Sequence, residues 1–412
     1  MPADSTGSSE SSQLPRVLLY ATSSGLGGSG LDSTSIEGAL AAQRAGFLRR
    51  VFCFANRQQE IPRHSVRSLQ RHPVRLLSFL ESQYYYAAKK RMLDGAAAAE
   101  LRRGNYDSFH GWSGESFRSL IEARLRGIPS VIDVPTWHRN KGVVKPAETR
   151  SERQVRLRGR GWKHWRELLQ ASRLQILSEY DLADVLLMPS IKSKETFLAA
   201  GLPEAKLHYV GRGADLERYH PAPHPPAKFR AIFVGALIRR KGVHHLLAAW
   251  RQCAFPDGEL VLVGTLHDEL KPALAELATP SVKLAGFSSS VADELRQASV
   301  FVFPSECEGF AKVTIEAAAC GLPLIATHES GDAMVDGETG WKIPANDPDA
   351  IAAALRAAAA RPDECRARGA RARARVEKTF SWDHYRDRIL QGYELACRLR
   401  QGRGGGIQSG RS

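Results

Sequence analysis

The segment from Pro304 to Thr327, PSECEGFAKVTIEAAACGLPLIAT, combines acidic side chains with the expected start of a helix. That helix is predicted to begin near Ala311, after an apolar strand at Val300 to Phe303. Unpaired amides in a helix's first turn, together with its dipole, favour an anion there. Glu308 and Glu316 are eight residues apart, slightly over two turns, so they would lie on a similar face at different depths. The pattern predicts a phosphate site with a carboxylate on either side.

Three cations stand in a second segment, RRKG, which comes after a predicted strand. Lys241 would be a suitable phosphate partner on such a loop. Alternatively, Lys241 is a solvated surface charge, and a glutamate near a helix start is a cap or dipole partner. The order of strand, Pro-Ser, Glu-Gly-Phe, Glu, Gly-x-Pro and second strand favours the ligand-binding interpretation.

Short apolar runs alternate along the chain with amphipathic, Ala- and Leu-rich stretches. This alternation predicts an α/β fold of parallel sheets covered by helices on both faces. The predicted strands are Val17 to Ala21, Val51 to Ala55, Ser108 to His110, Ser130 to Val134, Val185 to Pro189, Ala231 to Val234, Leu260 to Val263, Val300 to Phe303 and Pro323 to Ala326.

The sequence GADLERYHPAPHPPAK, with four prolines, predicts a linker over residues 213–228. We therefore expect a first domain over 16–212 and a second over 229–381. Residues 1–15 and 401–412 have too little apolar content to offset the entropy of ordering and are expected to be disordered.

Taken together, these segments resemble the retaining glycosyltransferases of family 4, the glycosyl transferases group 1. The resemblance covers residues 16–400 and is densest in the C-terminal half, where it includes residues 233–250, 331–355 and 380–394. It implies the GT-B fold: two Rossmann-like domains with parallel sheets facing across an interdomain cleft. It also implies that a C-terminal helix at 382–400 completes the N-terminal domain, which would bind the acceptor, while the C-terminal domain would bind the donor.

The resemblance also implies roles for single residues. Glu308 would contact the donor sugar, Glu316 the nucleotide ribose and Lys241 the diphosphate. Many relatives carry an arginine where this chain has Ala236, so Arg239 or Arg240 would supply the second positive charge. The family's Glu-Gly-Phe-Gly-Leu motif is altered here, and its remaining donor-binding positions are Gly309, Phe310, Ala311 and Lys312.

A glycine-rich loop, SSGLGGSG, comes after the first predicted strand and precedes a helix with a Thr34-x-x-Glu37 capping box. It matches the dinucleotide fingerprint G-x-G-x-x-G. An NAD site would need an acid at the end of the second strand, where this chain has Asn56. We instead interpret the loop as the glycosyltransferase loop near donor phosphates or acceptor, with Gly27 and Gly28 as candidates.

His110 is expected to end a strand and so to lie at the cleft, where similar family members place a histidine near the anomeric carbon. Alternatively, it is a buried core histidine. His138, in DVPTWH, is a second strand-end candidate.

No metal or other cofactor is expected. Asp347-Pro348-Asp349 imitates a D-x-D motif but precedes a helix, where acids ordinarily cap. Four histidines near the linker and the next helix lack tetrahedral ligand spacing: His220, His224, His244 and His245. Cations and helix amides would stabilise the diphosphate instead.

The net charge of +14 calls for an anionic partner. Between Arg139 and Arg173 stand eleven basic and three acidic residues, either a solvated helix face or a surface that attracts anionic lipid. The six scattered cysteines and the polar N-terminus without a leader favour a cytoplasmic protein, either free or peripheral at the inner face of a membrane.

The prediction is thus a metal-independent, retaining hexosyltransferase that moves a sugar from a UDP- or GDP-sugar to a glycan, lipid-linked or small-molecule acceptor. Two alternatives are a sugar-nucleotide epimerase of similar shape and a non-catalytic basic binding protein. Nucleic acid is not expected as a partner, because basic stretches interleaved with aromatic residues are lacking.

Overall fold

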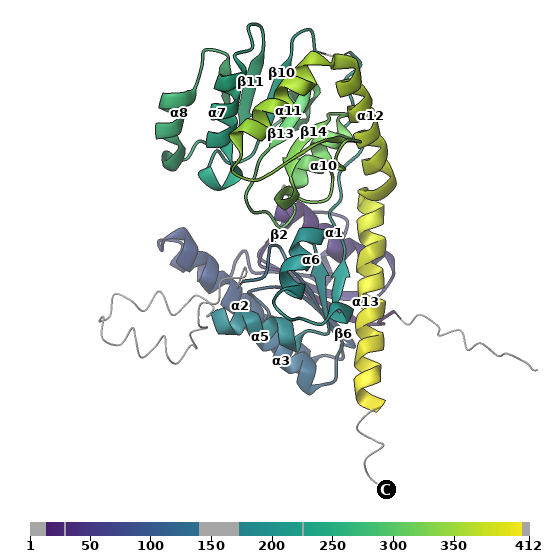
Figure 1. The fold of residues 1–412 in the computed structure, drawn as a ribbon. Coiled ribbons are helices and arrows are strands. Elements are labelled where there is room, and N and C mark those ends of the chain that lie inside the picture. Colours follow the sequence, from purple (N-terminus) through teal and green to yellow (C-terminus); the bar gives the residue numbers. More distant parts are fainter. Residues whose placement is uncertain (1–13, 29, 140–172, 225, 406–412) are drawn as a thin grey trace, which may run out of the picture. The chain divides into compact units, whose positions relative to one another are not determined.

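The computed structural model of this chain describes residues 14–28, 30–139, 173–224 and 226–405. Its contacts divide the chain into two compact units. Unit 1 comprises Met1–Asp133, Pro146–Leu187 and Arg386–Ser412, and unit 2 comprises Val134–Lys145 and Met188–Tyr385. Figure 1 labels helices and strands of both units.

The first sheet has seven strands in the order β5-β3-β1-β6-β7-β8-β9, and neighbouring strands from β5 to β8 pair in parallel. Its four central strands β1, β6, β7 and β8 are wholly buried, as a sheet covered on both faces requires. The strands are β1 Leu18–Ala21, β3 Leu48–Cys53, β5 Val66–Ser68, β6 Ser108–Trp112, β7 Ser130–Asp133, β8 Val185–Met188 and β9 Leu207–Tyr209. A separate pair joins β2 Gly25–Leu26 to β4 Ala55–Asn56.

Helices connect these strands, because parallel neighbours need a crossover between the end of one strand and the start of the next. They are α1 Leu31–Arg44, α2 Ser82–Arg103, α3 Phe117–Leu125, α5 Arg173–Leu182 and α6 Ile191–Leu198, with short 3-10 turns η1 Arg63–Ser65, η2 Pro73–Leu77 and η4 Glu204–Lys206. The last helix, α13 Trp382–Gly405, clusters with unit 1 from Arg386 onward. There Arg386 contacts Glu37 of α1.

The second sheet has six strands in the order β12-β11-β10-β13-β14-β15, all paired in parallel. Its strands are β10 Arg230–Val234, β11 Glu259–Val263, β12 Val282–Gly286, β13 Val300–Phe303, β14 Leu324–Thr327 and β15 Gly340–Ile343. Its helices are α7 Val243–Cys253, α8 Lys271–Leu277, α9 Val291–Arg296, α10 Lys312–Ala319, α11 Pro348–Ala360 and α12 Pro362–Thr379, with 3-10 turns η5 Arg239–Lys241, η6 Asp268–Leu270 and η7 His328–Ser330.

The core of unit 2 is built on the two central strands. Phe233 of β10 and Phe303 of β13 stack with ring centroids 5.4 Å apart, and neither is exposed. Helix α7 covers this sheet with a stripe at positions i, i+3, i+4 and i+7, formed by Val243, Leu246, Leu247 and Trp250. Fully burying each large apolar side chain contributes about 1.5–3 kcal/mol, so these elements give the segments that come after β10 and β13 a rigid base.

The prediction of parallel α/β sheets is confirmed, and all nine predicted strands are present with bounds that differ by at most three residues from those expected. Six other strands were not predicted, because they are short or, like β12, carry exposed residues that break the apolar run. None of the helices in the described part of the chain is long and apolar enough to span a bilayer.

Two cap predictions have different outcomes. Asp347 caps α11, since its Oδ1 accepts from the Ala350 amide at 2.9 Å. The capping box at Thr34 is wrong: α1 already begins at Leu31 with Gly30 at its N-cap, and Thr34 is buried inside the helix. Glu37 cannot reach the helix start from there and contacts Arg386 instead.

Candidate active site

The order of the second sheet reverses between β10 and β13. The chain leaves β10 toward β11 and β12, and it leaves β13 toward β14 and β15 on the opposite side. In open parallel sheets, the crevice outside the carboxyl ends of such a strand pair is where ligands bind. The segment that ends at Lys241 comes after β10, and the segment that contains Glu308 comes after β13, so the topology brings both to this point.

Glycines allow Lys241 to occupy this place. Its Nζ lies 5.0 Å from the centre of the Phe303 ring, and a Cβ added at Gly235 would be 3.1 Å from the same Nζ. Gly242, with φ of 70°, starts α7 so close to β13 that an added Cβ would be 2.1 Å from the Pro304 carbonyl oxygen. The Lys241 ammonium therefore lies beside Gly235, which comes directly after β10, and beside Phe303, the last residue of β13.

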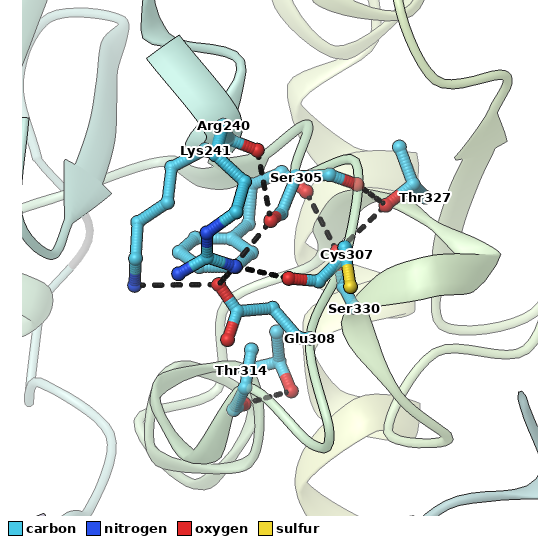
Figure 2. A network of polar contacts seen from close by, with 10 residues as sticks. Arg240, Lys241, Ser305, Cys307, Glu308, Thr314, Thr327 and Ser330 are labelled. Atoms are coloured by element: carbon cyan, nitrogen blue, oxygen red, sulfur yellow. Dashed lines mark hydrogen bonds and ion pairs between the residues drawn. The ribbon is translucent and has the colours of Figure 1, made fainter. Parts of the chain in front are cut away.

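Figure 2 shows Glu308 in contact with Arg240, Lys241 and Ser305. Its Oε1 lies 3.1 Å from Arg240 Nη1 and 3.5 Å from Lys241 Nζ, and it accepts a bond from the Ser305 hydroxyl at 3.2 Å. Arg240 Nη1 also donates to the Cys307 carbonyl. The carboxylate and Lys241 are mostly buried, with 16% and 18% of their side chains exposed, whereas Arg240 is 47% exposed. One carboxylate and two cations thus share a small space with access to solvent.

Buried hydroxyls hold the loop that carries Glu308. Thr327 Oγ1 donates to the Ser305 carbonyl at 2.6 Å, and Ser330 Oγ donates to the Phe303 carbonyl at 3.0 Å (Figure 2). The Glu308 amide donates to the Glu329 carbonyl at 3.2 Å. Because these buried groups have partners, the loop is positioned before any ligand arrives.

Glu316 lies on α10 and is only 12% exposed. Lys312, one turn earlier, places its Nζ 3.3 Å from Glu316 Oε1 and 5.2 Å from the centre of the Trp382 ring. Burial, and after it the Glu316 carboxylate, raises the pKa of Tyr219 well above its usual value. Glu316 is thus an acceptor group surrounded by a cation and a phenol, deeper along α10 than the mouth of the helix.

The amides expected to bind phosphate are not all available. The Ala311 amide donates to the Ser330 carbonyl at 2.8 Å, so it already has an acceptor in this structure. The Phe310 side chain packs against Phe380 with ring centroids 5.9 Å apart. The first turn of α10 begins directly after Ala311, and the Thr314 amide donates back to the Ala311 carbonyl at 2.8 Å. Gly309, which is buried, leads into this turn.

The glycine-rich loop lies at the corresponding reversal of the first sheet, between β1 and β6. Gly27 and Gly28 have φ of 82° and 133°, and the Gly25 amide donates to Asp32 Oδ1 at 2.9 Å. The nearest atoms to a Cβ at Gly28 include the guanidinium of Arg57, 3.7 Å away. An arginine beside the loop suits an anionic group better than the ribose of NAD.

Sequence reasoning missed a carboxylate at this reversal. Glu115 comes after β6 and is 7% exposed. It accepts from the Ser23 amide at 2.6 Å and from the Ser23 hydroxyl, and Lys90 Nζ lies 3.5 Å away. The only signal in the sequence was that Glu115 comes after β6, a strand that ends at the same edge of the sheet as β1.

The prediction that a strand ends at His110 is wrong, since β6 continues to Trp112. His110 is fully buried, its ring centroid lies 4.6 Å from that of Tyr20, and its Nδ1 lies 2.7 Å from Tyr393 Oη. His138 is also buried, with its ring centroid 5.0 Å from that of Phe197. Both side chains pack in the core, which is the alternative considered for His110.

Burial of His110 makes a testable contribution to stability. Burial lowers the pKa of His110 from 6.5 to about 3, so the unfolded chain takes up a proton that the folded chain does not. The contribution of His110 to the free energy of unfolding is complete above pH 6.5 and decreases as the pH falls toward 3. The decrease has a slope of up to about 1.4 kcal/mol per pH unit. Urea unfolding at several pH values should show a shallower acid slope for His110→Gln. An unchanged slope, equal to that of the exposed-site control His64→Gln, would contradict this account.

The two possible metal signals in the sequence, the D-x-D motif and the four histidines, have different outcomes. Asp347 is a helix cap, as expected. His244 and His245, however, come together with Glu306, which the sequence did not single out. The other two histidines, His220 and His224, do not join that group in the described part of the chain.

Residues 228–361 match the family model described as Glycosyl transferases group 1. This segment is a glycosyl transferases group 1 domain. It contains Lys241, Glu308 and Glu316 together, so the predicted likeness to the group 1 family is confirmed on the residues that suggested it.

Proteins similar to this chain extend the likeness beyond the group 1 domain. The alpha-maltose-1-phosphate synthase of Mycolicibacterium smegmatis is 30% identical over 52% of this chain and 63% of its own length. The D-inositol 3-phosphate glycosyltransferase 1 of Catenulispora acidiphila is 28% identical over 77% of this chain and 79% of its own. The GDP-mannose-dependent alpha-mannosyltransferase of Mycobacterium tuberculosis is 29% identical over 57% and 60%. The chain therefore spans less than two thirds of the first and third of these relatives.

Solved structures similar to the chain show its fold. Sucrose-phosphate synthase from Thermosynechococcus elongatus matches with a TM-score of 0.67 and 21% identity, covering 94% of this chain and all of that one. The Anabaena protein HepE in complex with UDP-glucose matches with a TM-score of 0.63 and 16% identity, covering 91% and 98%. The group 1 domain is thus one of two Rossmann-like units of a GT-B fold.

Proposed function

We propose that this protein is a retaining hexosyltransferase that moves a sugar from a UDP- or GDP-sugar to an acceptor hydroxyl in glycan or glycolipid synthesis. The observation that carries the proposal is the group formed by Glu308, Lys241 and Arg240 at the strand reversal of the group 1 domain. The names of the relatives support the donor class, since one is called GDP-mannose-dependent and one similar structure holds UDP-glucose.

In this proposal the donor diphosphate lies at the start of α10. Lys241 and Arg240 neutralise it, and the dipole of α10 adds positive potential at the start of the helix. The diphosphate competes with Glu308 for the two cations, which frees the carboxylate to turn to the sugar. Within the described residues Glu308 contacts both cations and Ser305 through Oε1, so Oε2 is the oxygen that accepts from a sugar hydroxyl. Glu316, deeper along the helix, accepts from the ribose hydroxyls.

The reaction breaks the bond between the anomeric carbon and the diphosphate oxygen, and the nucleoside diphosphate leaves with the electron pair. The acceptor oxygen bonds to the same face of that carbon, and its proton passes to the departing phosphate. Preorganised cations stabilise the charge that develops on the leaving group. Because Lys241 and Arg240 supply this positive charge, we propose that the reaction needs no metal ion.

The division of labour between the domains is part of the proposal. Residues 229–381 bind the donor, and residues 16–212, completed by 382–400, bind the acceptor. In the latter, the loop at Gly27 and Gly28 and the neighbouring Glu115 stand where the sheet order reverses. His110 has a packing role here rather than a catalytic one.

The choice between donors is tested by thermal unfolding with UDP-, GDP- and ADP-sugars. A ligand at 100 times its Kd stabilises the folded state by about 2.7 kcal/mol. The stabilising donor is then incubated with and without acceptors. Released nucleoside diphosphate together with a glycosylated acceptor supports transfer, whereas an epimerised donor without acceptor supports the epimerase alternative. A chain that no nucleotide sugar stabilises would contradict the proposal and favour a non-catalytic binding protein.

We also propose peripheral association with an anionic membrane. The basic stretch first suggested for this lies outside the described residues, apart from Arg139 and Arg173. The described residues offer another surface before α2: Leu76 and Phe79 are 77% and 76% exposed. Four exposed arginines accompany them along this connection: Arg63, Arg67, Arg71 and Arg75. Exposed apolar side chains among cations suit a lipid surface, where each basic residue contributes about 1 kcal/mol.

Sedimentation with phosphatidylglycerol vesicles should bring down the protein, and phosphatidylcholine vesicles should bring down much less. Replacing Leu76 and Phe79 by serine should reduce the bound fraction at equal salt. Equal binding to both kinds of vesicle, or none to either, would contradict the proposal.

A further inference from the structure

A second cluster of chemistry-bearing side chains adjoins the donor loops. His244 and His245 stand in the first turn of α7, immediately after Gly242 and Val243, and Glu306 comes after β13. One ligand atom from each of the three residues lies within 4.8 Å of the others. Adjacent residues on a helix normally do not face each other. The two imidazole ring centroids are nevertheless only 3.9 Å apart.

In each histidine, one ring nitrogen has a lone pair that could bind a metal ion. His245 Nε2 lies 3.1 Å from Asn346 Oδ1. Because an amide oxygen only accepts, Nε2 carries the hydrogen and Nδ1 keeps its lone pair. A bond of this kind, from the second ring nitrogen to an oxygen, is typical of metal-ligating histidines.

His244 has no such partner. Its Nδ1 is buried and lacks a hydrogen-bond partner among the described residues, an unusual state for a buried polar atom. This nitrogen is therefore available as a ligand.

We propose that His244, His245 and Glu306 bind one divalent transition-metal ion of the Zn²⁺ class. Two imidazoles and one carboxylate suit Zn²⁺ and its first-row neighbours, whereas Mg²⁺ and Ca²⁺ prefer all-oxygen sites. Three protein ligands leave a fourth tetrahedral position for water. Only small side-chain movements are needed to bring ligand atoms within 4.8 Å of one another to metal-binding distances.

The position of this site gives it a consequence. The Glu306 amide donates to the Arg240 carbonyl at 3.0 Å, and the Arg240 guanidinium lies 3.1 Å from Glu308. An ion held by Glu306 would therefore join the start of α7 to the loop that orders Arg240 and Glu308. It would act as a brace beside the donor site rather than as a participant in the proposed transfer.

The test measures ion binding without any nucleotide sugar, so its result is separate from that of the proposed function. The full chain is treated with a chelator, dialysed and titrated with Zn²⁺ in a calorimeter. One ion should bind, with an affinity at least about 10-fold weaker in His245→Ala and in Glu306→Gln. The control His64→Ala changes an exposed histidine of unit 1 and should leave the affinity unchanged.

Co²⁺ gives a second measurement on the same proteins. Its visible absorption bands should appear with the unmodified chain and the control and be lost in both site variants. Circular dichroism shows whether each variant is folded. Failure of the unmodified chain to bind Zn²⁺ or Co²⁺ would overturn the proposal. So would equal binding by folded site variants, because the ion would then lie elsewhere.

Discussion

Replacing Glu308 by glutamine should lower kcat by up to about 10³-fold while leaving the free energy of unfolding nearly unchanged. Glutamine has the same shape, so its amide oxygen can still accept from Ser305 and Arg240, which lie 3.2 and 3.1 Å from Oε1 in the native protein. What it lacks is the negative charge that faces the sugar as positive charge develops on the anomeric carbon. Removing one preorganised electrostatic contact of this kind typically costs about 10²–10³-fold in kcat.

The matched control for this variant is Glu338→Gln, which removes the same charge from an exposed position of the same unit. Its kcat should equal that of the unmodified enzyme. Initial rates of nucleoside diphosphate release, measured at saturating donor, separate the effect on kcat from one on KM. If Glu308→Gln turned over at the native rate, Glu308 would have no part in the chemistry.

Replacing Gly242 by alanine should lower the free energy of unfolding by about 3 kcal/mol or more. The residue has a φ of 70°, a conformation that costs an L-residue about 1–2 kcal/mol. In addition, the new Cβ would lie 2.1 Å from the Pro304 carbonyl oxygen. The backbone must shift to relieve that overlap, and the shift moves Lys241 away from Glu308. Urea denaturation measures the loss of stability, and the donor KM should rise in parallel.

The control Gly337→Ala separates the two causes. Gly337 has a φ of 74°, close to that of Gly242, but nothing lies within 4 Å of an added Cβ. Its cost should be the conformational penalty alone, about 1–2 kcal/mol. Equal losses in the two variants would show that the close approach of α7 to β13 contributes nothing.

Much of the fold was predictable because its signals are local. Buried parallel strands are continuous apolar runs, and the central strands of both sheets have this pattern. Asp347 was recognised as a cap from its place before a helix, since a cap needs only the three residues after it. Edge strands such as β12 were missed, because an exposed strand has no apolar run to mark it.

The same distinction between local and tertiary information applies to the candidate site. The sequence by itself determined that Lys241, Glu308 and Glu316 stand next to strand ends and a helix start, since order along the chain places each residue on its element. Only the tertiary structure decided which carboxylate oxygen the cations contact, that the Ala311 amide is occupied, and that His110 is enclosed by Tyr20 and Tyr393. It also brought Glu306 to the two histidines at the start of α7, far from it in the chain. Such contacts depend on how separate elements pack, and a residue's neighbours in sequence carry no record of that.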